Sequence, residues 1–366
     1  MSRLRDIRWS DSLSYVIPLL AVVTLGLTWG RLLPPVVVVV VALLLAGAVL
    51  SAVHHAEVVA HRVGEPFGSL VLAVAVTVIE VALIVSMMLS AKGGASSLAR
   101  DTVFAAVMIT CNGIVGLSLL FATRRRRVAV FNAGGTGSAL ASVATLATMC
   151  LVLPTFTPTT PGPAFSPPQL WFAAVASLAL YVLFVVTQTI RHRQAFLPVT
   201  EAGEVIDADE HEPPSMRLTS GSLVLLLVAL VAVVGLAKVE SPAIEAAVSA
   251  AGLPQSVVGV VIALLVLLPE TIAAVRAAQR GRVQISLNLG FGSAMASIGL
   301  TIPTIAVAST WLGGRLLLGL GSMQIVLLAL TVVVATLTVV PGRATLLQAG
   351  LHLVLFAAFL FLAVSP

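Results

Sequence analysis

Two glutamates stand alone in long uncharged segments of this 366-residue chain. Glu80 and Glu270 each lie inside an apolar run, and no Lys or Arg occupies the interior of such a run. A carboxylate in apolar surroundings needs either a proton or a positive counter-charge, so an isolated pair is suited to exchanging protons for cations. We assign the other acidic residues to loops or helix ends: Asp6, Asp11, Glu57, Glu65, Asp101, Glu240, Glu245 and the six carboxylates of 201–212.

The energetic cost of these two residues favours a functional role. An ionised carboxylate at the centre of a membrane helix costs about 2.5–3.5 kcal/mol. If Glu80 and Glu270 face each other, desolvation and mutual repulsion favour protonation of the empty pair. A divalent cation can then replace two protons without changing the net charge. The alternative is that both glutamates are protonated and serve only as structural hydrogen-bonding groups.

Additional oxygen ligands are available near both glutamates. Calcium takes six to eight oxygens, so two carboxylates alone are insufficient. Thr77 lies one helical turn before Glu80, and Pro269 leaves the carbonyl of Leu265 without its helical donor. Polar residues in the helices that follow are further candidates, although packing roles are equally compatible with the two asparagines. These residues are Asn112, Asn288 and Ser293.

Several titratable residues lie near predicted membrane edges. His54, Glu57 and His61 of the sequence HHAEVVAH share one helical face. We interpret them as a pathway mouth or surface helix, with a metal-binding or proton-sensing cluster as the alternative. Glu65 and Asp101 are candidates for lining the ion pathway, or are simple interfacial charges. We expect His352, in the last apolar run, to be a packed neutral histidine.

The composition predicts an all-α polytopic membrane protein. Hydrophobic residues make up 59% of the chain and charged residues only 10%, against roughly 25% charged residues in soluble domains. A membrane helix needs about 20 apolar residues, and eleven such runs can be counted. The expected spans are 13–30, 34–53, 66–91, 101–123, 128–153, 168–190, 220–239, 254–278, 284–310, 317–340 and 344–364. The long runs 66–91 and 254–278 should be tilted or broken.

The basic residues predict the orientation of these spans. With a cytoplasmic amino terminus, 15 of the 20 Lys and Arg residues fall in inner loops and 5 in outer loops. This distribution follows the positive-inside rule. We therefore expect a multi-pass protein of the inner (plasma) membrane, with its carboxyl terminus on the periplasmic or extracellular side.

A short internal repeat divides the chain into two membrane halves. Gly64-x-Pro and Gly252-x-Pro each open an uncharged stretch that contains one of the lone glutamates, and the two stretches cross the membrane in opposite directions. Inverted repeats of this kind are common in secondary transporters. The predicted divisions are an extra helix at 1–33, a first half at 34–200 (site helices 66–123), a linker at 201–219 and a second half at 220–366 (site helices 254–310). The acidic part of this linker, 201–212, is either a solvated connector or a cytosolic cation-sensing or pathway-mouth segment.

Four stretches resemble the bacterial calcium/proton antiporters of the calcium/cation antiporter superfamily. They are HAEVVAHRVGEPFGSLVLAVAVTVIEVALI, RDTVFAAVMI, LLPETIAAVRAA and ISLNLGFGSAMASIGLTIP. The resemblance is to the branch also described as sodium–calcium or potassium/proton antiporters. It implies ten core helices in two inverted five-helix halves, an extra amino-terminal helix, and paired site glutamates that map to Glu80 and Glu270.

The chain departs from this family pattern near both glutamates. Many superfamily members carry Gly-Asn three to four residues before each glutamate, where this chain has Val76-Thr77 and Val266-Leu267. Where the family often has a histidine directly after the second glutamate, this chain has Thr271. Where some exchangers have a glutamine later in the chain, it has Ala296. The loss of these oxygen ligands leaves sodium and potassium open as transported ions beside calcium.

These features together predict a secondary active transporter rather than an enzyme. We expect exchange of Ca²⁺, Na⁺ or K⁺ for protons by alternating access at the glutamate pair. The alternatives are a passive cation channel and an intramembrane enzyme that uses the carboxylates as acid and base. We expect the lipid bilayer and the transported ions as partners, and neither a cofactor nor nucleic acid.

Overall fold

The computed structural model describes residues 3–31, 33–63, 75, 77–82, 84–85, 97–125, 127–200, 214–311 and 315–365. The chain divides into two compact units, each built from two separate stretches of sequence. The first unit comprises Met1–Ser90 and His211–Gly252, and the second comprises Ala91–Glu210 and Leu253–Pro366. Each unit therefore contains segments from both predicted membrane halves.

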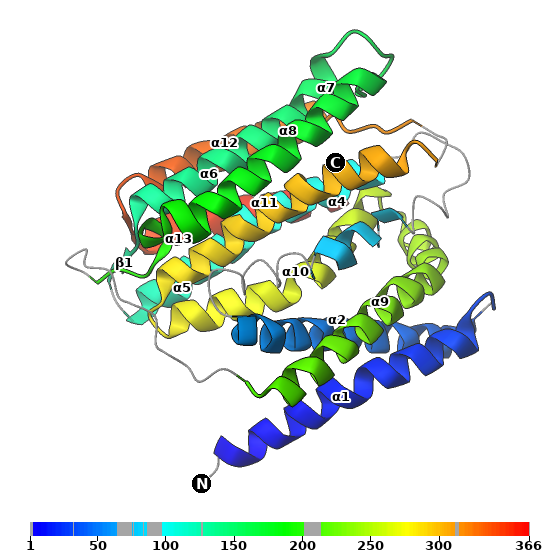
Figure 1. Ribbon diagram of the computed structural model, residues 1–366. Coiled ribbons are helices and arrows are strands. Elements are labelled where there is room, and N and C mark those ends of the chain that lie inside the picture. Colours follow the sequence, from blue (N-terminus) through cyan, green and yellow to red (C-terminus); the bar gives the residue numbers. More distant parts are fainter. Residues whose placement is uncertain are drawn as a thin grey trace. The chain divides into compact units, whose positions relative to one another are not determined.

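Three long helices pack against one another in the first unit. They are α1 (Arg3–Thr28), α2 (Pro35–Val63) and α9 (Met216–Ala250) (Figure 1). The carbonyl of Ser14 on α1 accepts hydrogen bonds from the Ser51 hydroxyl and from His55 Nε2, at 2.5 Å and 3.0 Å. Gly235 lets α1 approach α9 closely, because an added Cβ would lie 2.3 Å from Cδ2 of Leu25.

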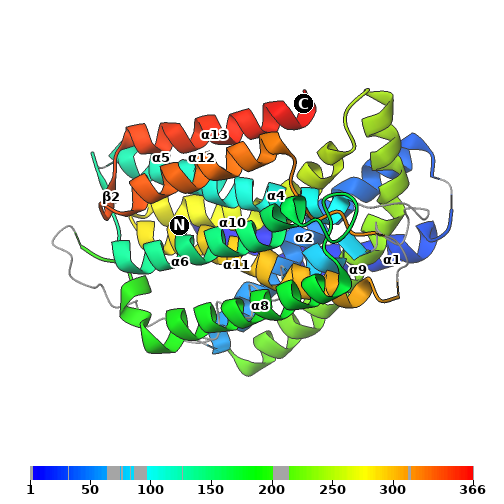
Figure 2. The same cartoon turned by 90° about the horizontal axis from the view of Figure 1, so that it is seen from above.

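A nearly buried helical span forms the centre of the second unit. It consists of α4 (Leu98–Met108), the π-helix η1 (Ile109–Ile114) and α5 (Val115–Arg125). Of its most apolar 18-residue stretch, 89% of the residues are buried. The corresponding share for α13 (Leu346–Val364) is 17%. The helices α10 (Ser256–Gln279) and α11 (Val283–Ala308) pack directly on this span (Figure 2).

Further helices complete the second unit. They are α6 (Ala133–Ala147), η2 (Thr148–Val152), α7 (Leu153–Phe156), α8 (Pro167–Val186), η3 (Thr187–Arg191), η4 (Arg193–Phe196) and α12 (Ser322–Val339). The helices α6 and α8 both pack against α11, and α12 packs against α6 and α13. Hence α11 is covered by several helices, which agrees with its largely buried residues.

Loops of the second unit gather at two ends. At one end, β1 (Ala129–Val130) pairs antiparallel with β2 (Arg343–Ala344), and the backbone N–H of Asn132 donates to the Gln284 side chain at 2.6 Å. At the other end, the Thr155 hydroxyl donates to the carbonyl of Leu320 at 2.8 Å. The first set of loops is predicted to be cytoplasmic and the second external. Within this unit, loops predicted to lie on the same side of the membrane are therefore found at the same end.

The all-α membrane fold is confirmed, whereas the count of eleven spans is not. In the described part of the chain, eight helices are long and apolar enough to cross a membrane, or nine if the two segments of the bent α10 form one span. The apolar part of α1, Ser12–Thr28, is shorter. Most of the predicted span 66–91 and most of the acidic linker 201–219 lie outside the described residues.

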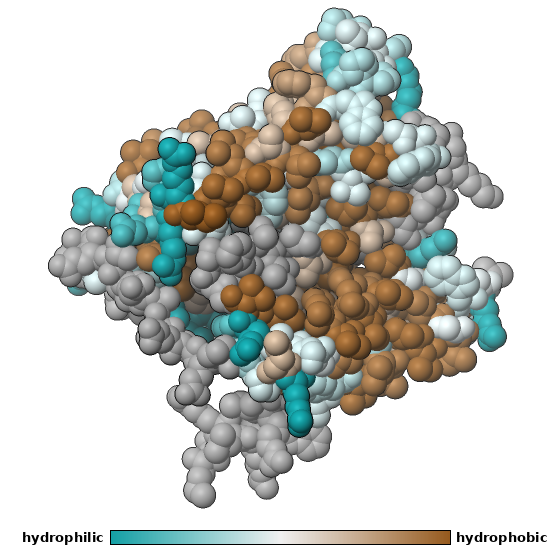
Figure 3. Space-filling view, viewed as in Figure 1, coloured by the Kyte–Doolittle hydropathy of each residue, from teal (hydrophilic) through white to brown (hydrophobic). Residues whose placement is uncertain are grey.

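Large hydrophobic side chains are exposed on helices of both units. Val36 and Leu43 on α2 are 75% and 70% exposed, and Phe172 on α8 and Leu347 on α13 are 68% and 71% exposed. Hydrophobic residues cover broad areas of the face drawn in Figure 3. Soluble monomers rarely expose apolar patches of this extent, so these surfaces are suited to contact with lipid.

Candidate cation-binding site

Glu270 lies at a bend in α10. The helix changes direction by 49° between Ser256–Leu268 and Glu270–Gln279, and Glu270 itself is only 6% exposed. Pro269 occupies the break in the sequence, and a proline inside a helix removes one backbone hydrogen bond and kinks the helix. This bend agrees with the prediction that the long run is tilted or broken rather than straight.

The π-helix η1 lies against the helix that carries Glu270. All six of its residues, Ile109–Ile114, are buried, and it contacts both α10 and α11. Gly290 on α11 faces this turn, where an added Cβ would make an ordinary contact at 3.5 Å with the carbonyl oxygen of Thr110. Single π-helical turns often occur at functional sites because they redirect side chains and backbone carbonyls. Of this segment only Asn112 was predicted as a ligand, and its π-helical form was not predicted.

A hydroxyl chain joins α11 to α10 one turn after Glu270. The Ser286 hydroxyl donates to the carbonyl of Ala274 at 2.7 Å, and its oxygen lies 2.5 Å from the Ser118 hydroxyl on α5. Because Ser286 has one hydroxyl hydrogen, the consistent arrangement has Ser118 donating to Ser286. These hydrogen bonds link α5, α10 and α11.

The structure places Asn112 in a buried polar network with α12 and α13. Its Nδ2 donates to the Thr331 hydroxyl at 2.9 Å, and its Oδ1 lies 3.2 Å from Nδ1 of His352. His352 is fully buried, and its Nε2 lies 3.2 Å from the Thr338 hydroxyl. Both ends of the Asn112 amide are thus engaged, and its role as a cation ligand stays a prediction.

Asn288 is engaged at the loop end of α11. Its Oδ1 accepts from Nε2 of Gln284 at 2.9 Å, and its Nδ2 donates to the carbonyl of Phe196 at 2.7 Å. These contacts tie α11 to η4, which is a structural role. Ser293, on the same helix, is partly buried. The ligand roles predicted for Asn288 and Ser293 remain predictions.

Glu80 and Thr77 are both buried in the first unit. They lie in the helical stretch 77–82 and are 3% and 4% exposed. Their separation of three residues places them on the same helical face. Glu80 and Glu270 belong to different units, and the pairing of their carboxylates stays a prediction.

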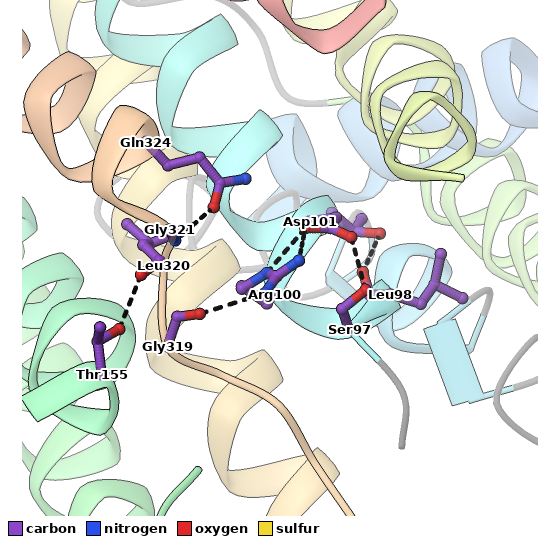
Figure 4. Close-up of polar contacts among 10 residues, drawn as sticks. Ser97, Leu98, Arg100, Asp101, Thr155, Gly319, Leu320, Gly321 and Gln324 are labelled. Atoms are coloured by element: carbon purple, nitrogen blue, oxygen red, sulfur yellow. Dashed lines mark hydrogen bonds and ion pairs between the residues drawn. The ribbon is translucent and has the colours of Figure 1, made fainter. Parts of the chain in front are cut away.

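Asp101 forms an ion pair at the start of α4. Its carboxylate lies 2.8 Å from Nη2 of Arg100 and also accepts from the Ser97 hydroxyl at 2.9 Å. Arg100 in turn donates to the carbonyl of Gly319 at 3.2 Å (Figure 4). Arg100 lines a groove of about 520 Å³ together with Thr155, Thr157 and other residues of the loops that are predicted to be external. Asp101 is therefore a neutralised carboxylate beside this groove.

The HHAEVVAH sequence occupies the end of α2. His54 and Glu57 are partly buried and His61 is exposed, whereas His55 is fully buried. Among the described residues, no three His, Cys, Asp or Glu side chains are grouped to hold a metal ion, so the metal-cluster alternative lacks a ligand set. Their pathway role stays a prediction. Glu65 lies outside the described residues.

Comparison with known proteins decides the family. The profile of the sodium/calcium exchanger protein family matches residues 33–190 and 221–365, which is most of the chain. The chain belongs to this exchanger family. The two matched stretches lie close to the predicted halves 34–200 and 220–366, and the inverted relation of those halves stays a prediction.

Individual relatives of this exchanger cover nearly its full length. The protein y4hA of Sinorhizobium fredii is named as a proposed ionic transporter. It is 46% identical to this chain over 356 residues, which is 96% of each chain. The sodium-potassium/proton antiporter ChaA of Escherichia coli K12 is 34% identical over 350 residues, 95% of this chain and 94% of ChaA. The crystal structure of the H⁺/Ca²⁺ exchanger CAX superposes with a TM-score of 0.69 at 16% identity, covering 97% of this chain and 88% of CAX. This last likeness concerns the fold.

One acidic residue of this exchanger was assigned wrongly from the sequence. Glu240 was predicted to lie in a loop or at a helix end, but it lies inside α9 and is 2% exposed. Lys238, Glu240 and Pro242 together suggested that the span ended at residue 239. The helix instead continues to Ala250, because the residues after Pro242 include many good helix formers. The elimination that left only Glu80 and Glu270 as buried glutamates therefore missed a third.

Proposed function

We propose that this exchanger is a cation/proton antiporter with Glu80 and Glu270 as its ion-binding residues. It exchanges Ca²⁺, or alternatively Na⁺ or K⁺, for protons by alternating access. The observation that carries this proposal is the burial of both glutamates, at 3% and 6% exposed, on segments that follow the repeated Gly-x-Pro motif. A buried carboxylate is tolerated when a proton or a cation neutralises it.

Coupling follows from competition between protons and cations for the same oxygens. When the site is empty of metal, the two carboxyl groups keep protons because two adjacent buried charges repel each other. A divalent cation displaces both protons with no change in net charge. The protein can then change conformation with the site either cation-bound or protonated, but not with both carboxylates bare.

The oxygen ligands near the glutamates bear on the choice of ion. Thr77 can contribute a hydroxyl one turn from Glu80, and the break at Pro269 leaves a carbonyl available for a cation. Asn112 and Asn288 would supply amide oxygens only by sharing them with their present partners. This set is poorer than calcium prefers. ChaA is named for sodium and potassium and CAX for calcium, and we retain all three ions as substrates.

The orientation and location of the exchanger also belong to this proposal. The amino terminus lies in the cytoplasm and the carboxyl terminus on the periplasmic or extracellular side of the inner membrane. The distribution of basic residues supports this orientation. The grouping of loops at two ends of the second unit supports the alternation of its spans.

The test is ion-driven proton flux in reconstituted vesicles. Wild-type protein should release protons when an inward gradient of Ca²⁺, Na⁺ or K⁺ is applied, with saturable dependence on the ion. Glu80→Gln and Glu270→Gln should each abolish exchange, whereas Glu245→Gln, a partly buried residue of α9, should not. Normal exchange in either site variant would rule out the proposal. Steady, unsaturated conductance without proton coupling would favour the channel alternative.

A further inference from the structure

Glu240 on α9 has a buried carboxylate oxygen with no hydrogen-bond partner in the described part of the chain. Glu240 is 2% exposed, and its Oε1 has no hydrogen-bond partner. The next residue, Ser241, is 1% exposed, and its hydroxyl oxygen also has none. Two consecutive buried side chains therefore each offer an oxygen atom that no described residue hydrogen-bonds. Such groups carry a desolvation cost unless something binds them.

A proline in the same helical turn frees a third oxygen. Pro242 lies inside α9 and has no N–H, so the carbonyl of Lys238, four residues earlier, loses its usual helical donor. Carbonyls released by a break in a membrane helix are common cation ligands. We define the carboxylate of Glu240, the hydroxyl of Ser241 and the carbonyl of Lys238 as the Glu240 site.

Within the part of the chain that the structure describes, no basic side chain forms an ion pair with Glu240. The ammonium group of Lys238 lies 5.1 Å from the centre of the Trp29 ring. Among the described helices, α1 and α2 pack against α9. The segment of α2 before His54 has no charged or titratable residue, and Ser12–Thr28 of α1 has only Tyr15. Arg31, beyond α1, is exposed.

We propose that the Glu240 site binds a monovalent alkali cation, Na⁺ or K⁺. Carboxylate, hydroxyl and carbonyl oxygens are the ligands that hard cations prefer. A single carboxylate balances one positive charge, whereas a divalent ion would leave an uncompensated charge among apolar helices. The site lies in the first unit and uses neither Glu80 nor Glu270, so it is proposed in addition to the exchange site, which the proposed function assigns to those two glutamates.

The test uses the full chain with the exchange site disabled. In the Glu80→Gln/Glu270→Gln background, thermal unfolding in detergent is compared in NaCl, KCl and choline chloride at equal ionic strength. Na⁺ or K⁺ should raise the unfolding temperature, because a ligand that binds only the folded state stabilises it. Adding Glu240→Gln should abolish that rise, and Ser241→Ala should shift the half-saturating concentration upward several-fold. Glu245→Gln on the same helix is the matched control and should keep the rise.

The outcomes separate this site from the proposed antiport. A cation-dependent rise that persists with Glu240→Gln, or no rise in the background, overturns the Glu240 site whatever the result of the flux assay. A Glu240-dependent response to pH with no response to Na⁺ or K⁺ also overturns it, because the carboxyl would then hold a proton. If Glu240→Gln fails to fold, retention of the rise at unchanged half-saturation in Ser241→Ala contradicts the proposal, and an upward shift supports it.

Discussion

His352 on the last helix contacts Asn112 in the π-helix η1, with Nδ1 of the imidazole 3.2 Å from Oδ1 of the amide. The two residues are 240 positions apart in the chain. This contact fixes one end of the amide, and the 2.9 Å hydrogen bond to Thr331 fixes the other. The π-helical turn that packs against α10 is therefore held in place by α12 and α13.

Replacing His352 should destabilise the second unit. In His352→Ala, the Oδ1 of Asn112 loses this contact while it remains buried, which costs about 1–3 kcal/mol in addition to lost packing. Thermal unfolding in detergent measures the effect. The control is His192→Ala, an exposed residue, for which we expect a change within about 0.5 kcal/mol. Equal stability of the two variants would show that the contact is energetically unimportant.

Removing the Ser286 hydroxyl should loosen the packing of α11 on α10. Ser286→Ala loses the bond to the Ala274 carbonyl and the contact with Ser118, a loss of about 0.5–1.5 kcal/mol in unfolding free energy. Ser138→Ala is the matched control, because the exposed Ser138 hydroxyl bonds only within its own helix, to Gly134. Chemical unfolding of both variants provides the comparison. The account is wrong here if Ser138→Ala is the more damaging change.

Two glycines of α6 should respond oppositely to the same substitution. An added Cβ at Gly135 would lie 2.1 Å from the carbonyl oxygen of Ala195, whereas one at Gly137 would have only an ordinary contact at 3.8 Å with Val339. Gly135→Ala should therefore cost about 1–3 kcal/mol through overpacking. Gly137→Ala should be neutral or stabilising by up to about 1 kcal/mol, since alanine favours helix. Expression level and unfolding temperature can be compared, and tolerance of Gly135→Ala would contradict the close approach.

The spans could be predicted from sequence because a bilayer requires long uncharged runs. The predicted runs 168–190 and 284–310 closely match α8–η3 at Pro167–Arg191 and α11 at Val283–Ala308. The end of α9 was missed, because Lys238, Glu240 and Pro242 resemble a helix end whenever burial by other helices is unknown. The π-helical form of Ile109–Ile114 could not be predicted either, because it depends on packing against α10, α11 and α13.

The candidate site could be predicted only in part from the sequence. The burial of Glu80 and Glu270 was predicted, since an acid in an apolar run stands out. The partners of Asn112 and Asn288 were not, because Thr331 and Phe196 lie 219 and 92 positions away in the chain. The two amides hydrogen-bond residues that are close to them only in the folded chain.

Proton release on cation binding tests the central claim most directly. Calorimetric titration of the purified protein with Ca²⁺, in buffers of different ionisation enthalpy, counts the protons released per cation bound. If Glu80 and Glu270 share one cation, binding of Ca²⁺ at neutral pH should release protons, and each glutamine variant should lose both the binding and the release. Ca²⁺ binding that displaces no protons, or that is unchanged in Glu80→Gln or Glu270→Gln, would contradict the account.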